Sequence, residues 1–190
     1  GAHLLDRGLR LYLFSMIPER RMPLENYTGF LALRNGVPIG YGGGWIFGER
    51  CEIGVNIFET FRGGENSYIF TNILRVYNRV FGIKQFAVPP YQFGYGNDEG
   101  LKSGAFWFYY KLGFRPADES LALLAASEAQ KIEHDKKYHS SLKTLKQLAE
   151  YPLELKNGRT KFSLQPKQIS IVITKWIAKN FNSDHDAATR

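Results

Sequence analysis

A glycine-bearing turn lies between an apolar strand and an amphipathic helix in the first half of this chain. The segment Ile53–Phe58 is mostly apolar and predicts a strand. Gly63 and Gly64 interrupt this pattern, and from Tyr68 to Phe81 apolar residues recur at helical spacing. Such an order gathers free backbone N–H groups and the positive end of a helix dipole at one place. That combination suits an anion, and phosphate most of all.

The side chains around the turn fit an anion site, although they also allow a plainer interpretation. Arg62 precedes the glycines and could fork onto phosphate oxygens, and Ser67 or Asn66 can cap the helix. The spacing is neither G-x-G-x-x-G nor a Walker loop, so dinucleotide and triphosphate motifs do not apply. Glycines after a strand often just turn the chain, and Arg62 could pair with Glu59 or Glu65 instead of a ligand.

A second motif lies further along the chain. The segment Phe106–Phe114, FWFYYKLGF, resembles the closing motif of the GNAT acyltransferase superfamily, in which a short helix with a tyrosine runs into Leu-Gly-Phe. Upstream, Asn56–Ser67 is similar to the superfamily's strand and pyrophosphate loop. One helix, one strand and one loop separate the two motifs, as in the superfamily, and the resemblance covers residues 27–114. The positions that match the closing motif are Ala105, Tyr109, Lys111, Leu112, Gly113 and Phe114.

The resemblance implies acyl transfer from acyl-coenzyme A, as co-substrate, to a small-molecule or peptide amine. The backbone N–H groups of Gly63–Ser67 would hold the pyrophosphate. The edge of the strand Val55–Phe58, splayed from its parallel neighbour Phe86–Val88, would pair with the pantetheine arm. The residues that this implies for cofactor binding are Asn56, Ile57, Phe58, Arg62, Gly63, Gly64, Glu65, Asn66 and Ser67.

The resemblance also implies roles for catalytic side chains. Chemistry in such a site is mostly positioning, with backbone N–H stabilisation of the tetrahedral oxyanion. Tyr109 would act as the general acid that returns a proton to the leaving thiolate. Glu99, with Asp98, is the candidate general base, and Glu52 is the next candidate after these two. Tyr109 lies among other aromatic residues and could equally be a core residue, and Glu99 in a glycine-rich loop could be a solvated turn residue.

Three features depart from the superfamily's pattern. Glu65 occupies a position where glycine is usual, so its carboxylate would repel a pyrophosphate unless it points away or pairs with Arg62. Lys102 stands where an asparagine is common, and Gly1–Glu25 is shorter than the usual opening elements. These departures keep open an alternative function, a non-catalytic GNAT-like binding or assembly module of a larger protein. Gly1 in place of an initiator methionine fits additional domains in a full-length chain.

The predicted elements around these motifs form a mixed sheet. Asn35–Gly36 is a strong hairpin signal between the strands Tyr27–Arg34 and Val37–Phe47, and the glycines of the second strand indicate a bulge or the close approach of a ligand or another backbone. A strand–helix–strand crossover makes Lys84–Val88 parallel to the strand before the glycine turn. Pro89–Gly104 is a long aromatic loop of a length that is usually functional.

After Pro116 the pattern becomes helical. Lys156–Arg159 predicts a turn, and Trp176 on the final helix predicts a core residue. The expected fold class is α+β: a GNAT-like mixed, mostly antiparallel sheet with a splayed parallel strand pair flanked by helices, plus a C-terminal helical extension. We expect an acyltransferase domain over residues 1–118, with a shortened front end, and the extension over residues 119–190.

Composition narrows the classes of function. The net charge of +7 on 190 residues is spread evenly without a basic run, so nucleic-acid binding is not favoured. Cys51 is the only cysteine, which excludes a disulfide framework and a cysteine metal cluster, and the spacing of His134 and His139 is not that of a zinc motif. We therefore predict no metal site. No apolar run is long enough to span a bilayer and no signal peptide is evident, so we expect a cytoplasmic protein.

Overall fold

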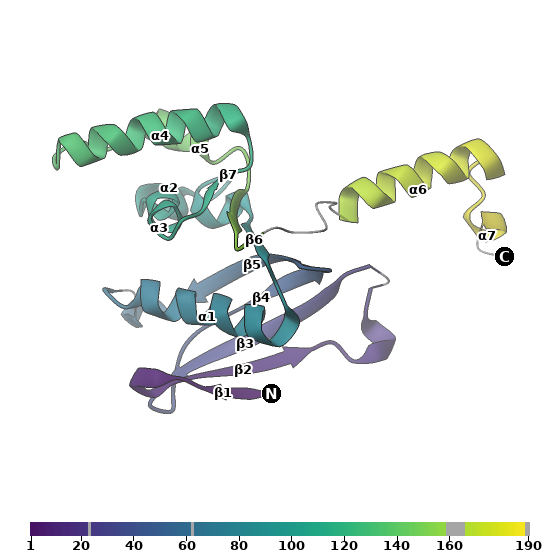
Figure 1. Ribbon diagram of the computed structural model, residues 1–190, viewed down its shortest axis with the longest axis horizontal. Coiled ribbons are helices and arrows are strands. Elements are labelled where there is room, and N and C mark those ends of the chain that lie inside the picture. Colours follow the sequence, from purple (N-terminus) through teal and green to yellow (C-terminus); the bar gives the residue numbers. More distant parts are fainter. Residues whose placement is uncertain (23, 62, 159–165, 189–190) are drawn as a thin grey trace.

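One mixed sheet organises the molecule. The computed structural model describes residues 1–22, 24–61, 63–158 and 166–188 (Figure 1). The sheet has eight strands in the order β1-β2-β3-β4-β5-β6-β8-β7, and each neighbouring pair is antiparallel except β5 and β6. The strands are β1 (Ala2–Leu4), β2 (Leu9–Ser15), β3 (Asn26–Arg34), β4 (Val37–Phe47), β5 (Arg50–Ile57), β6 (Gln85–Val88), β7 (Arg115–Pro116) and β8 (Leu153–Lys156).

Helices of very different lengths surround the sheet. Helix α1 lies across the sheet, whereas α2 to α5 gather at the far end from the N-terminus (Figure 1). The α-helices are α1 (Asn66–Phe81), α2 (Asp98–Lys102), α3 (Ala105–Lys111), α4 (Glu119–His134), α5 (Leu142–Leu148), α6 (Pro166–Phe181) and α7 (His185–Ala188). Short 3-10 turns are η1 (Asp6–Gly8), η2 (Pro18–Arg20), η3 (Glu59–Phe61) and η4 (Pro90–Phe93).

Helix α1 buries one face against the sheet and so fixes the position of the turn before it. Its residues Ile73 and Tyr77 are fully buried in the same core as Phe30 and Ile53 of the sheet. The Tyr77 hydroxyl donates a hydrogen bond of 2.6 Å to the carbonyl of Thr28 in β3. A buried phenol of this kind needs a partner, and here the partner ties the helix to the sheet.

The predicted hairpin is confirmed. Asn35 and Gly36 both have positive φ angles, 49° and 85°, which is the requirement of a two-residue type I′ turn between β3 and β4. The glycines of β4 do permit close approach, as predicted. A Cβ atom on Gly42 would lie 2.2 Å from the backbone carbonyl oxygen of Gly54 in β5, and one on Gly40 would lie 2.6 Å from that of Asn56. The neighbouring Gly44 instead makes room for a side chain, the Sγ of Cys51.

The crossover from β5 through α1 to β6 is also confirmed, and with it the α+β fold class. The sheet is mostly antiparallel with one parallel pair, and helices flank it. The segment after residue 118 is helical for the most part but also contributes β8, which pairs with both β6 and β7. Lys156, predicted to begin a turn, is instead the last residue of this strand. The prediction that Trp176 lies in the core is wrong, because 53% of this residue is exposed on α6.

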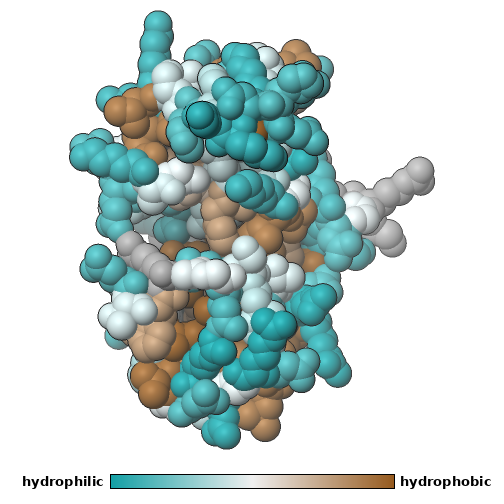
Figure 2. Space-filling model, turned by 90° about the vertical axis from the view of Figure 1, so that its left-hand side faces the viewer, coloured by the Kyte–Doolittle hydropathy of each residue, from teal (hydrophilic) through white to brown (hydrophobic). Residues whose placement is uncertain are grey.

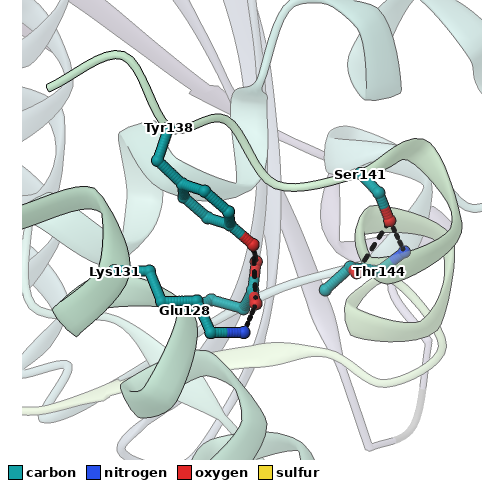
Figure 3. A network of polar contacts seen from close by, with 5 residues as sticks. All are labelled: Glu128, Lys131, Tyr138, Ser141 and Thr144. Carbon is teal, nitrogen blue, oxygen red and sulfur yellow. Dashed lines mark hydrogen bonds and ion pairs between the residues drawn. The ribbon is translucent and has the colours of Figure 1, made fainter. Parts of the chain in front are cut away.

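A buried carboxylate fixes the connection between α4 and α5 (Figure 3). Glu128 accepts hydrogen bonds of 3.0 and 2.9 Å from the Tyr138 hydroxyl and pairs with Lys131 at 2.7 Å. Burial alone would raise the pKa of Glu128, but hydrogen bonds, above all from Lys131, outweigh it and hold the pKa below its usual value. Ser141 caps α5 by accepting from the backbone N–H of Thr144 at 3.1 Å. Tyr138 is therefore held against α4.

We predict that Gly44→Ala lowers the free energy of unfolding by about 1–3 kcal/mol, because the added methyl group overpacks the contact between β4 and β5. It would meet the Cys51 Sγ at 2.3 Å and the Tyr77 ring at 3.3 Å. Urea denaturation measures the change. The effect should shrink in a Cys51→Ala background, where the obstructing sulfur is gone.

Gly64→Ala is the matched control, since a Cβ atom there meets no atom within 4 Å. It should change the free energy of unfolding by less than about 0.5 kcal/mol. Equal losses for the two glycine variants would show that crowding at Cys51 is not the reason for glycine in β4.

Candidate active site

The parallel strands β5 and β6 part soon after they begin. They pair only from Arg50 to Glu52 on β5, opposite Gln85 to Ala87 on β6. Strand β5 continues to Ile57, whereas β6 ends at Val88 and the chain leaves it through Pro89 and η4. The edge of β5 beyond Glu52 therefore faces no neighbouring strand within the described part of the chain. The splayed pair implied by the resemblance is present.

A cleft of about 410 Å³ opens where the two strands part. Its walls carry three aromatic side chains from β3 and β4, one carboxylate from β5, and polar groups from β5 and η4. The residues that contribute these groups are Tyr27, Tyr41, Trp45, Glu52, Asn56 and Gln92. The cleft thus combines an exposed strand edge with an apolar, aromatic wall, a combination that suits an extended ligand with an amide backbone.

Gln92 lies inside this cleft and takes the place of a strand partner. Its side-chain Oε1 accepts a hydrogen bond of 3.4 Å from the backbone N–H of Val55. Gln92 also explains part of the local sequence, because a Cβ atom on Gly54 would lie 3.3 Å from its Nε2. An amide group therefore already occupies the position where the amide of a bound ligand would pair with β5. The segment Pro89–Gly104, predicted to be a long loop, instead contains η4 and α2. Its predicted length indicated a functional segment, but nothing singled out Gln92.

The glycine turn leads directly from β5 into α1. Cβ atoms on Gly63 or Gly64 would meet no atom within 4 Å, so the backbone there is open to a ligand. The N–H of Gly63 faces the Asn66 side chain, whose Oδ1 accepts at 3.4 Å. Helix α1 begins at Asn66, whose backbone N–H donates to the Gly63 carbonyl at 3.2 Å. The N–H groups that follow in the first turn of a helix have no partners within the helix. Arg62, predicted to contact pyrophosphate, lies outside the described residues.

The face that carries the beginning of α1 is not uniformly polar. Figure 2 looks onto the left-hand side of Figure 1, where α1 begins, and shows apolar side chains gathered across the middle of this face. Hydrophilic side chains frame them above and below. A ligand with both charged and apolar parts could find partners on one continuous surface here.

Glu65, the main departure from the superfamily's pattern, is neutralised by cations from outside the turn. Arg34, at the end of β3, forms an ion pair with its carboxylate and donates a hydrogen bond of 3.2 Å. Arg7 of η1 lies 3.8 Å away. The backbone of Glu65 has a φ of −98°, which any residue adopts, so the turn does not require glycine there. No local sequence signal pointed to Arg34 or Arg7 as partners of Glu65, since both are distant from it in the chain.

The three remaining strand residues predicted to bind the cofactor are placed differently from one another. Asn56 lines the cleft. The backbone N–H of Phe58 donates to the carbonyl of Ile39 in β4 at 3.0 Å, so it is directed away from the cleft edge. The Phe58 ring lies 5.9 Å from that of Tyr41. Ile57, between them, is half-buried at the end of β5.

Tyr109, the predicted general acid, lies in an aromatic cluster below the cleft and does not line it. It is 4% exposed, and its ring lies 5.5 Å from that of Phe70, 6.2 Å from Phe93 and 5.8 Å from Phe114. Burial raises the pKa of Tyr109 well above its usual value, so the phenol stays protonated. Among the described residues its hydroxyl has no hydrogen-bond partner.

The three candidate bases do not lie together. Glu52 is part of the cleft wall, 3.7 Å from the guanidinium of the buried Arg50. Glu99, the predicted base, and Asp98 are exposed in the first turn of α2, outside the set of residues that line the cleft. Within the described ranges, no group of three or more His, Cys, Asp or Glu side chains could hold a metal ion.

No protein-family model matches the chain, and no curated protein sequence matches it. Among solved structures, the chain is similar to the N-acetyltransferase PseH of Campylobacter jejuni, also solved with acetyl coenzyme A. That similarity has 16% identity, covers 70% of this chain and 69% of that chain, and has a TM-score of 0.42.

Two other solved structures are similar. One is an acetyltransferase of Salmonella typhimurium that modifies the N-terminal serine of a 50S ribosomal subunit protein (18% identity, 33% of this chain and 38% of that chain, TM-score 0.30). The other is a cAMP-binding acyltransferase of Mycobacterium smegmatis (9% identity, 90% and 52%, TM-score 0.42). Separately, no helix in the described ranges has both the length and the apolar character needed to cross a bilayer.

We predict that Cys51 resists alkylation in the native protein. The thiol is fully buried, and burial raises its pKa to about 12, so almost no thiolate exists at pH 8. Iodoacetamide should label the native chain at least about a thousandfold more slowly than the urea-unfolded chain, because labelling must await unfolding. Intact-mass spectrometry over time measures both rates, and rapid native labelling would contradict this account of the β5 core.

Proposed function

We propose that this chain is an acyl-coenzyme A-dependent N-acyltransferase that transfers an acyl group to an amine. The observation that carries the proposal is the free edge of β5, which opens where β6 turns away and leads directly into the glycine turn before α1. One continuous stretch thus offers strand amides for an extended arm and helix N–H groups for phosphate. Residues 1–118 carry this site, and the segment from 119 supports it through the pairing of β8 with β6.

The pantetheine arm would lie along β5 and replace Gln92. A pantetheine amide carbonyl can accept the Val55 N–H bond that the Gln92 side chain now makes at 3.4 Å. One amide thereby substitutes for another, so the displacement leaves no buried donor without a partner. Asn56, on the same wall, would contact the arm.

The pyrophosphate would bind at the N-terminal end of α1. The backbone N–H groups of Gly64, Glu65 and Ser67 would bind it. Those of Gly63 and Asn66 would join them after they release the Asn66 side chain and the Gly63 carbonyl. The pairing of Glu65 with Arg34 and Arg7 reduces its repulsion of the phosphates, and Arg62 would add a cation.

In the proposed reaction the amine nitrogen attacks the thioester carbonyl carbon, and the carbon–sulfur bond breaks as the tetrahedral intermediate collapses. Tyr109 would donate its proton to the departing thiolate, and a carboxylate would take the proton that the amine loses. Glu99 is the base proposed from the sequence, and Glu52 is the carboxylate on the cleft wall. Gln92 and Phe93 are adjacent on η4, and Phe93 contacts Tyr109. Displacement of Gln92 would therefore also move Phe93, whose ring packs against the proposed acid, Tyr109.

The acceptor would be an amine that binds as a cation before it loses a proton. The cleft offers the Glu52 carboxylate and the faces of Tyr27, Tyr41 and Trp45, which attract cations through their ring electrons. A small-molecule amine or a peptide amine fits this description equally well.

A non-catalytic binding or assembly module is the second candidate function. Two observations favour it: Gln92 already fills the strand-pairing position in the cleft, and Tyr109 is enclosed by rings rather than exposed at the cleft wall. Such a module could still bind coenzyme A, but it would turn over no amine.

We predict that acetyl-coenzyme A raises the melting temperature, because a ligand of the native state stabilises it by mass action. Glu65→Gln should tighten binding about two- to fivefold by removing a negative charge beside the phosphate site and releasing Arg34 and Arg7. Thermal shift and isothermal calorimetry measure the two effects.

Glu19→Gln is the matched control, since it removes the same charge from η2, at the other end of the sheet from the start of α1 (Figure 1). It should leave the affinity unchanged. If neither acetyl- nor long-chain acyl-coenzyme A stabilises the protein, the enzyme assignment is lost.

We also predict that Tyr109→Phe lowers kcat by roughly tenfold or more while KM for acyl-coenzyme A changes less than twofold, as expected when only the transition state loses an interaction. Steady-state release of free coenzyme A, followed with a thiol reagent and a panel of amines, measures both constants. Unchanged turnover would make Tyr109 a packing residue, and binding without turnover in the parent chain would favour the non-catalytic module.

A further inference from the structure

A second cavity, of about 900 Å³, lies between α3 on one side and α4 and α5 on the other. It shares no lining residue with the cleft at β5. Its inner wall is apolar, with Leu101 and Leu145 buried and Ile132 half-buried. The volume is within the range that holds a small organic ligand.

An indole donor without a partner belongs to a residue that lines the cavity from α3. The Nε1 of Trp107 is buried and has no hydrogen-bond partner among the described residues, and Trp107 lines the cavity. Its ring is held in place by Phe106 and Tyr110, whose centroids lie 5.1 and 5.2 Å away, so it cannot easily turn toward another acceptor. A buried N–H left unpaired is destabilising, so an acceptor that reaches it through a small shift of the neighbouring side chains would be favoured.

The connection between α4 and α5 closes the other side of the cavity. Ser140 and Tyr138 line it there, and a hydrogen bond from Ser140 is among those that hold the pKa of Glu128 below its usual value. Tyr138 and Lys131 bind the same carboxylate (Figure 3). Among the described residues that line the cavity, the Trp107 Nε1 is therefore the donor left without a partner.

The charges around the cavity are mostly positive. Lys102, Lys111, Arg115 and Lys136 line it, against the single carboxylate of Glu133. Arg115 is fixed above the Tyr110 ring, 3.9 Å from its centroid, and bonds to the Tyr110 and Phe114 carbonyls. The three lysines form no ion pair with another described residue. This surplus favours an anion and disfavours the cationic amine proposed for the cleft.

We propose that this cavity binds an amphipathic carboxylate, whose apolar chain packs on Leu101, Ile132 and Leu145 and whose carboxylate accepts the Trp107 Nε1 hydrogen bond. The lysines and Arg115 supply the positive field that selects the anion. The site is separate from acyl transfer at β5 and stands whether or not that reaction occurs.

Decanoate, below its micelle concentration, is the probe for this site, with decanol and decyltrimethylammonium as the neutral and cationic probes of the same chain length. Calorimetry and tryptophan emission on the full chain should show decanoate binding at least about tenfold more tightly than either, as expected for one hydrogen bond to a charged group. Decanoate should also raise the melting temperature.

Two sets of variants locate the binding. Trp107→Phe should weaken decanoate about tenfold and abolish the emission change, whereas Trp45→Phe, in the cleft, should preserve both. The exposed double variant Lys102→Gln with Lys136→Gln should weaken decanoate about three- to tenfold and leave decanol unaffected.

Three results would overturn the proposal. The first is no binding of decanoate, which would mean that water satisfies the cavity. The second is equal affinity for decanol, which would mean that no anion is recognised. The third is an unchanged affinity in both Trp107→Phe and the lysine double variant, which would place the ligand elsewhere. Acetyl-coenzyme A binding to the Trp107→Phe variant separates a failure here from a failure at the cleft.

Discussion

Two consecutive prolines set the shape of the sheet at its centre. Strand β6 is four residues long, and Pro89 and Pro90 follow it directly. Proline has no backbone N–H and cannot extend a ladder in the middle of a sheet, so β6 must end at Val88 while β5 runs on. Along its other edge β6 is fully paired with β8 from Gln85 to Val88. The opening beside β5 thus follows from the backbone N–H groups that the two prolines lack, and not from any side chain that lines it.

That opening connects the two parts of the proposed acyltransferase site. The edge of β5 and the beginning of α1 are joined by η3 and a short turn, so a ligand that uses both needs no domain movement to reach them. The electrostatics of the turn depend on more distant elements, since Arg34 at the hairpin and Arg7 in η1 neutralise Glu65. Helix α1 holds this arrangement because Tyr77 anchors it to β3.

Local sequence signals predicted the elements whose cause is local. Asn35–Gly36 indicated the hairpin because its positive φ angles suit few other residues, and the apolar spacing of α1 indicated a helix against a sheet. Strand β8 was not predicted because its alternation of apolar and charged residues lasts for only four residues, Leu153–Lys156. Its pairing with β6 depends on contacts with residues far away in the chain. Gln92 and the partners of Glu65 were not predicted either, because their contacts also join residues that are far apart in the chain. The prediction that Trp176 is buried was wrong because an apolar stripe on a helix predicts a buried face but does not identify the element that would cover it.

The insertion of β8 between β6 and β7 has a consequence for how the chain is made. A ribosome releases β6 long before Leu153–Lys156 emerge, so the nascent sheet carries an unpaired central edge during that interval, made of residues that the finished fold buries. Open edges of this kind recruit other strands and invite aggregation. Completion of the sheet is therefore a late event in synthesis, because helices α4 and α5 stand between the exposed edge and its eventual partner in the sequence.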